Sequence, residues 1–408
     1  MGTWTWFRTS QSLSSFRPVA DQLAADQHHT QHDEQDRKGR HLKRRAQERP
    51  YQIHTSPHQG EDAEHRAPHP DGDALERARC VQPEQNQADA DCARTGGEKV
   101  EQAATSGVPA LDSLNRLIRG DSLNADLFYE RAKIMLAAGE TNQALADINK
   151  ALQLKDKEAD YFVTLADIYL AINKVPGCLE ALLKARELDL ENNDALLKLG
   201  EVYLILKDYD NTFKYTGMAL DNDRINPVAH FIRGYAYLEL GDTSLAVKNF
   251  QAAADQDQDY YEAYVQLGIL YSIVKDPLSI GYLQTATRID PNRAEGWYLL
   301  GMAYQEQENV GKALDTYNKL LVIAPQYKEA LYNIGYINLV YTGDYTTAID
   351  YFTRAIAIDP KYTDAIFNRG YSYELSGDLG NARKDYQRSL EVTPNYDRAI
   401  DGLNRLDR

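Results

Sequence analysis

The chain of 408 residues is poor in cysteine, methionine and tryptophan, with three, four and three of each. Three cysteines do not make a disulfide framework, and Cys80 and Cys92 have no useful metal-binding spacing. Cys178 occupies a position that other segments fill with alanine, which predicts a buried small side chain. No apolar run approaches the length needed to span a bilayer, so we expect no membrane span.

Motifs of catalytic chemistry are also missing. The sequence has no glycine-rich phosphate loop, no His-Glu-x-x-His, no Gly-x-Ser-x-Gly and no Cys-x-x-Cys pair. We therefore expect no enzymatic activity, with no catalytic residue, cofactor site or metal site; an accessory subunit of a separate enzyme stays open. The N-terminus lacks a positively charged start followed by an apolar core, which favours a cytoplasmic location.

The charge balance disfavours nucleic acid as a partner. Of 45 Lys or Arg and 61 Asp or Glu, 14 and 16 lie in residues 1–100, so residues 101–408 have a net charge of −14. Phosphate neutralisation dominates nucleic-acid binding, and an acidic chain supplies little of it. One basic run is either a solvated charge run or an anion-binding or nuclear-targeting segment. It comprises Arg37, Lys38, Arg40, Lys43, Arg44 and Arg45.

Residues 1–105 have a different composition from the rest. Eight of the nine histidines lie in the first hundred residues, among many Gln, Arg, Asp and Pro and almost no aliphatic runs. Such a segment cannot bury enough apolar surface to offset its ordering entropy, which predicts a disordered, low-complexity N-terminal segment. The alternative is that it is not genuine coding sequence and results from a mistaken upstream start.

The rest of the chain contains a small residue at nearly fixed spacing. The intervals are 34, 34, 34, 34, 33, 34 and 35 residues, which predicts one supersecondary unit repeated end to end. The eight positions are Ala132, Ala166, Gly200, Gly234, Gly268, Gly301, Gly335 and Gly370. In most copies an aromatic residue follows three positions later, and a second small residue twelve positions later. A large apolar residue then follows on the same helix face.

This pattern resembles the tetratricopeptide repeat. The copy that shows it best reads Trp297-x-x-Leu300-Gly301-x-x-Tyr304, then Ala313-x-x-x-Tyr317 and Pro325. The resemblance implies an all-α fold, a right-handed α-solenoid of tandem helix-turn-helix repeats. The eight expected copies are 125–158, 159–192, 193–226, 227–260, 261–293, 294–327, 328–362 and 363–396. One residue is missing near Lys275-Asp276-Pro277, and one is added near Tyr341-Thr342-Gly343.

Both ends of the array carry a further amphipathic segment. We expect an N-terminal capping helix within 106–124, ending at Gly120, and a C-terminal capping helix within 397–408.

A second pattern concerns three first helices that carry arginine where most carry leucine. Sixteen residues after Arg131 and Arg369 stand Asp147 and Asp385, so we predict an ion pair within each of these two copies.

The resemblance implies a non-catalytic protein–protein interaction scaffold. In this family the first helices line a concave groove that holds a segment of a partner protein. A bacterial cell-envelope or secretion-associated lipoprotein whose native N-terminus is missing remains an alternative. A co-chaperone is a further alternative: Asn333 and Asn368 occupy clamp-like positions, but Tyr298, Met302 and Tyr336 replace the Lys and Asn that such a clamp needs. The partner and the oligomeric state are left open.

In the last three copies we expect the residues three before and one after the small position to point into the groove, with Asn333 and Asn368 beside them. The predicted partner-binding residues are Tyr298, Met302, Tyr332, Asn333, Tyr336, Phe367, Asn368 and Tyr371. Aromatic rings with a polar tip are favoured at interfaces, although the same spacing also suits packing between adjacent repeats. For Tyr336 and Tyr371 we predict exposure, because the core positions on those helices are already filled by Ile334, Ile337, Ser372 and Tyr373. The first two copies offer a more charged surface.

Overall fold

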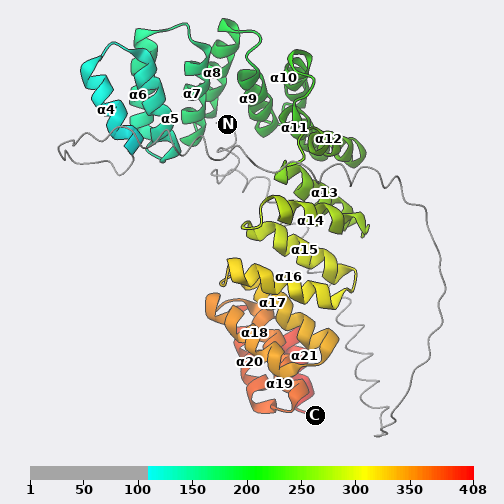
Figure 1. The fold of residues 1–408 in the computed structure, drawn as a ribbon. Helices are drawn as coiled ribbons and strands as arrows, with labels where there is room; N and C mark the ends of the chain where they lie inside the picture. Colours follow the sequence, from blue (N-terminus) through cyan, green and yellow to red (C-terminus); the bar gives the residue numbers. More distant parts are fainter. Residues whose placement is uncertain (1–108) are drawn as a thin grey trace, which may run out of the picture.

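The computed structural model describes residues 109–408, so the predictions for residues 1–105 lie outside the described part of the chain. The described residues form helices and no strand (Figure 1), which confirms the prediction of an all-α solenoid. After α4 (Pro109–Gly120) the helices follow in pairs, and α21 (Asp397–Leu406) comes last. The pairs are α5 (Ala125–Ala137) with α6 (Thr141–Leu154), α7 (Ala159–Ala171) with α8 (Val175–Leu188), α9 (Asn193–Ile205) with α10 (Tyr209–Asn222), α11 (Pro227–Glu239) with α12 (Thr243–Gln256), α13 (Tyr261–Ile273) with α14 (Leu278–Ile289), α15 (Ala294–Glu306) with α16 (Val310–Ile323), α17 (Lys328–Ile337) with α18 (Tyr345–Ile358), and α19 (Thr363–Ser376) with α20 (Leu379–Val392).

The pairs stack in chain order. The first helix of each pair packs most closely on the second helix of its own pair, and then on that of the neighbouring pair. Because contacts run between neighbours, the core is a continuous strip rather than a single centre. Figure 1 shows the stack changing direction around α11 to α13, so that the cyan-to-green and yellow-to-red halves extend along different directions.

The repeated glycine of the first helix lies against the repeated large side chain of the second. A Cβ atom on Gly268 would lie 2.5 Å from Leu283 Cγ, and one on Gly335 would lie 2.8 Å from Phe352 Cε1. Leu283 and Phe352 are themselves buried, with 1% and 0% of their surface exposed. Only a residue without a side chain lets these helices approach so closely, which explains why the small position repeats.

The two irregular copies differ from the others where their first helix ends and their second helix begins. In the shorter copy α14 has 12 residues, whereas the other second helices have 14. In the longer copy α17 continues into a π-helix, η1 (Asn338–Thr342), which ends at Gly343 with φ of 71°. Asn338 Nδ2 donates to the Ile334 carbonyl at 2.9 Å, and Thr342 Oγ1 donates to the Asn338 carbonyl at 3.1 Å. The additional residue is therefore absorbed by a wider helical turn.

Single helices cover both ends of the described stack. At one end α4 packs on α5, and Arg131 Nη1 donates to Asn115 Oδ1 at 2.7 Å. At the other end α21 packs on α20 so closely that a Cβ atom on Gly402 would lie 2.6 Å from Tyr386 Cε2. Arg119 of α4 is exposed, and so is Asp401 of α21. Both helices therefore bury one face and present polar residues to solvent.

Candidate functional site

The eight residues predicted to contact a partner lie on the first helices α15, α17 and α19, and they separate into two groups by burial. Five are at most 6% exposed: Tyr332, Asn333, Tyr336, Phe367 and Asn368. The other three, Tyr298, Met302 and Tyr371, keep part of their surface accessible. We call these three residues the tyrosine surface, and only they remain candidates for direct contact with a partner.

The buried asparagines connect neighbouring helix pairs. Asn333 Nδ2 donates to Tyr317 Oη at 3.0 Å, and Tyr317 Oη donates to Gln305 Oε1 at 3.1 Å. Asn368 Nδ2 donates in the same way to Tyr332 Oη at 2.9 Å. Each amide therefore gives a buried tyrosine hydroxyl a hydrogen-bond partner across the boundary between two pairs. For these residues the structure favours packing between repeats over exposure to a partner.

Tyr336 is 4% exposed, so the prediction that its ring is exposed is wrong. Tyr341 stands edge-on to it, with ring centroids 6.4 Å apart and ring planes at 68°. Tyr332 stacks on it, also with centroids 6.4 Å apart. Because Tyr341 belongs to η1, the additional residue of this pair places that ring over Tyr336. The 35-residue interval located the insertion in the sequence, but it did not show which side chain the insertion would cover.

Tyr371 and Tyr298 lie in partly apolar surroundings. Burial raises the pKa of Tyr298 to about 12 and also raises the pKa of Tyr371, so both hydroxyls stay protonated at neutral pH. Arg405 lies over the Tyr371 ring, 5.6 Å from its centroid, and is held by two hydrogen bonds of 3.0 and 2.8 Å to Glu374. The tyrosine surface thus offers ring faces, one thioether and hydroxyl donors beside a fixed ion pair.

A second group of polar side chains lies on the first helices α7 and α9. Lys198 Nζ pairs with Asp167 Oδ1 at 2.6 Å, with 15% and 23% of the two side chains exposed. Glu201, three residues further along α9, is partly buried and makes no hydrogen bond or ion pair with any residue of 109–408. We call Asp167, Asp194, Lys198 and Glu201 the acidic surface. The sequence analysis did not single out Glu201, because its spacing gave no indication of its burial.

The acidic surface contains more carboxyl groups than positive charges. Burial is the largest effect on Glu201 and raises the pKa of its carboxyl group to about 7. Lys198 acts against this shift, whereas the negative charges of Asp167 and Asp194 add to it. Three carboxyl groups therefore share the positive charge of a single ammonium group.

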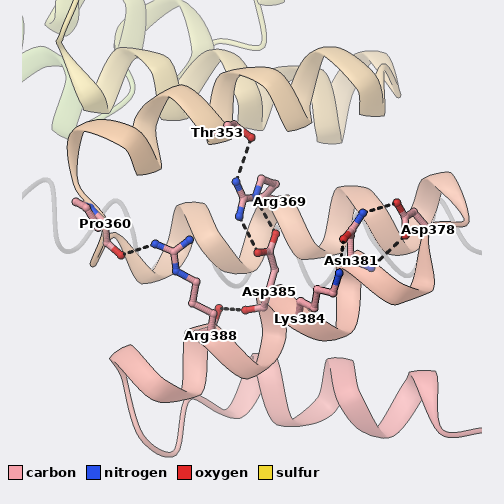
Figure 2. A network of polar contacts seen from close by, with 9 residues as sticks. Thr353, Pro360, Arg369, Asp378, Asn381, Lys384, Asp385 and Arg388 are labelled. Carbon is pink, nitrogen blue, oxygen red and sulfur yellow. Dashed lines mark hydrogen bonds and ion pairs between the residues drawn. The ribbon is translucent and has the colours of Figure 1, made fainter.

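The two predicted ion pairs are confirmed. Arg369 donates from Nε and Nη2 to the two carboxylate oxygens of Asp385, each at 2.7 Å, and Arg131 does the same to Asp147 at 2.6 Å. Figure 2 shows Arg369 between Asp385 and Thr353, which accepts a third hydrogen bond at 3.2 Å. Both pairs join the helices of one copy, so their role is structural.

Other sequence candidates have simple outcomes. Cys178 is a free thiol with 1% of its surface exposed, which confirms its prediction as a buried small residue. Burial raises the pKa of this thiol to about 12, so it is not a reactive thiolate at neutral pH. Across residues 109–408 no group of three His, Cys, Asp or Glu side chains is arranged to hold a metal ion. None of the helices in this range combines the length and the apolar character that crossing a membrane requires.

All three family profiles that match this chain describe the same repeat. Profiles described as tetratricopeptide repeat match residues 228–260, 294–327 and 337–400. No curated protein matches the chain.

Several solved structures are similar to this chain. The C-terminal part of a TPR repeat-containing protein from Cytophaga hutchinsonii aligns with a TM-score of 0.51 and 22% identity, over 59% of this chain and 99% of that one. MamA aligns with a TM-score of 0.38 and 25% identity, over 39% and 93% of the two chains. YrrB, described as a TPR protein with an unusual peptide-binding site, aligns with a TM-score of 0.35 and 21% identity, over 46% and 96%. The first of these alignments shows that the repeat fold is shared.

Proposed function

Since the chain is a tetratricopeptide repeat protein, we propose that it is an interaction scaffold that holds a segment of a partner protein against its first helices. In this proposal α5 to α20 are eight repeats over residues 125–396, and α4 and α21 are the caps. Stacked repeats present an extended surface rather than an enclosed pocket, which suits the binding of a chain segment. The proposal assigns no catalytic activity to the chain itself.

The observation that carries this proposal is the partial exposure of the tyrosine surface. Tyr298 and Met302 on α15 and Tyr371 on α19 remain accessible, while the residues between them on α17 are buried. Tyrosine and methionine contribute large contact areas, and a ring already held by its neighbours loses little entropy on binding. The buried hydrogen bonds of Asn333 and Asn368 fix α17 and α19 against their neighbours, which supports a preformed contact surface.

The proposal can be tested by quantitative affinity capture with the full chain as bait. The variant carrying Met302→Ala and Tyr371→Ala should capture specific partners at least tenfold less efficiently, because truncating a hot-spot side chain costs more than about 1 kcal/mol of binding free energy at each position. Val322→Ala is the matched control, because Val322 on the second helix α16 is 83% exposed and lies outside the tyrosine surface. Unchanged capture by the double variant would show that this surface is not the partner site.

A further inference from the structure

A second group of polar side chains, the acidic surface, lies on α7 and α9, three helix pairs away from the tyrosine surface. We propose that the acidic surface binds a Lys or Arg side chain of a segment from another protein, with Glu201 as its counter-ion. This inference rests on the proposed function and specifies the chemistry of the partner. It concerns a different set of first helices, so the two can fail independently.

The strongest support is that the carboxyl group of Glu201 accepts no hydrogen bond from residues 109–408. Asp167 already has Lys198 at 2.6 Å, whereas Glu201 has no donor among residues 109–408. A partly buried carboxylate without a donor loses hydration, and the Coulombic attraction of Lys198, which already pairs with Asp167, offsets only part of that loss. A guanidinium or ammonium group from a partner would supply the missing charge-assisted hydrogen bond. The raised pKa of Glu201, about 7, reflects the same deficiency.

The surroundings of Glu201 suit a long side chain with a charged tip. Leu197 and Leu204 lie four residues before and three after it on α9, and they belong to one apolar cluster. Tyr260, at the start of α13, is close enough for the charge of Glu201 to contribute to the raised pKa of its hydroxyl, although burial is the main cause. Lys and Arg can lay their methylene groups along the accessible part of Leu197 while the cationic group meets the carboxylate.

Charge also distinguishes between possible occupants. A second molecule of this chain would bring a surface of the same net sign, since residues 101–408 have a net charge of −14. A metal ion would need more ligands than the site provides, because residues 109–408 contain no group of three suitable side chains. The chain's own basic run at 37–45 contains six cations, whereas the acidic surface has three carboxyl groups and one ammonium group. A foreign segment with one or two cations among apolar residues matches this surface best.

Binding at Glu201 should be linked to proton release. The neighbouring titratable and charged groups are Lys198 and Asp194 on α9, Asp167 on α7, Cys178 on α8 and Tyr260 at α13. The pKa values of Lys198, Cys178 and Tyr260 are all raised, so between pH 6 and 7 the lysine stays charged and the thiol and phenol stay neutral. A cation that pairs with Glu201 favours its ionised form, so the complex should release a proton at pH 6.5.

The experiment is a selection from a phage-displayed random peptide library on the immobilised full chain, compared with Glu201→Gln and Glu180→Gln. Glu180 is exposed on the second helix α8, so its substitution makes the same chemical change elsewhere. Wild-type and Glu180→Gln protein should enrich peptides with a Lys or Arg among apolar residues. These peptides should bind Glu201→Gln at least tenfold more weakly. Calorimetry at pH 6.5 in phosphate and Tris should show proton release for wild type and none for Glu201→Gln.

The possible outcomes separate the two proposals. Enriched peptides without Lys or Arg, or with affinity independent of Glu201, would overturn this inference while leaving the proposed scaffold function intact. A failure to enrich any peptide would contradict both. If neutralising the six cations of residues 37–45 raised peptide affinity, the chain's own segment would be the occupant, and the inference would be wrong. Circular dichroism of each variant checks that the helices are retained.

Discussion

Arg369 and Asp385 face each other across the two helices of one repeat and share two parallel hydrogen bonds of 2.7 Å. Leu300 and Thr316 occupy the corresponding positions two repeats earlier and are 4% and 5% exposed. The same interface is therefore filled either by a leucine and a small polar residue or by an ion pair. The side chains of Arg369 and Asp385 are 14% and 8% exposed, so neither charge is well hydrated.

Breaking this ion pair from one side should be costly. Asp385→Ala leaves the Arg369 guanidinium without its main partner in a mostly buried position, so we expect a loss of about 2–4 kcal/mol in the free energy of unfolding. Arg369→Leu combined with Asp385→Thr recreates the pair found at Leu300 and Thr316, and should recover most of that loss. Urea denaturation followed by circular dichroism measures both changes. A single substitution as stable as wild type would show that the ion pair is not needed.

Overpacking at a helix boundary gives a second test. Ala348 on α18 has no exposed surface, so Ala348→Leu should lower the free energy of unfolding by about 1–3 kcal/mol. Ala357 on the same helix is exposed, and Ala357→Leu should change stability little. Equal thermal stability of the two variants would contradict the described packing of α18.

The pH dependence of stability should identify Glu201. Its pKa in the folded chain is about 7, above the usual value of 4.5, so the folded state holds the proton more tightly than the unfolded state. The stability contributed in this way is complete below about pH 4.5 and is lost as the pH rises to about 7. Glu201→Gln removes this dependence, so above pH 7 the variant should exceed wild type by up to about 3 kcal/mol.

Urea midpoints at pH 4, 6 and 8 measure the effect, with Glu180→Gln as the control that should follow wild type. If Glu201→Gln showed the same pH profile as wild type, the carboxyl group would be well hydrated in solution.

The cover over Tyr336 can be removed at a single position. Tyr341→Ala deletes the ring that lies edge-on to Tyr336, so tetranitromethane should nitrate Tyr336 several times faster in this variant. Peptide mass spectrometry assigns the modified tyrosine, and Tyr317, with no exposed surface, serves as the internal reference. Nitration of Tyr336 at an unchanged rate would mean that the following repeat, and not η1, buries the ring.

The sequence predicted contacts between residues of one repeat, but not burial that depends on distant segments of the chain. Arg369 and Asp385 lie 16 residues apart within one repeat, so a fixed spacing was enough to predict their ion pair. The burial of Tyr336 depends on a one-residue insertion whose conformation no spacing gives. Glu201 depends on α7, α9 and the start of α13, almost 60 residues further along, and that combination arises only when the repeats are stacked.

The π-turn at η1 also has a practical consequence for protein engineering. Thr342, Gly343 and Asp344 are exposed, and the chain already accepts one additional residue here without interrupting α18. Exposed turns of this kind tolerate longer insertions, because loop-closure entropy grows slowly with length. A short peptide tag placed between Thr342 and Gly343 would label the seventh of the eight helix pairs from within the chain, and would leave Asp344 in place to cap α18.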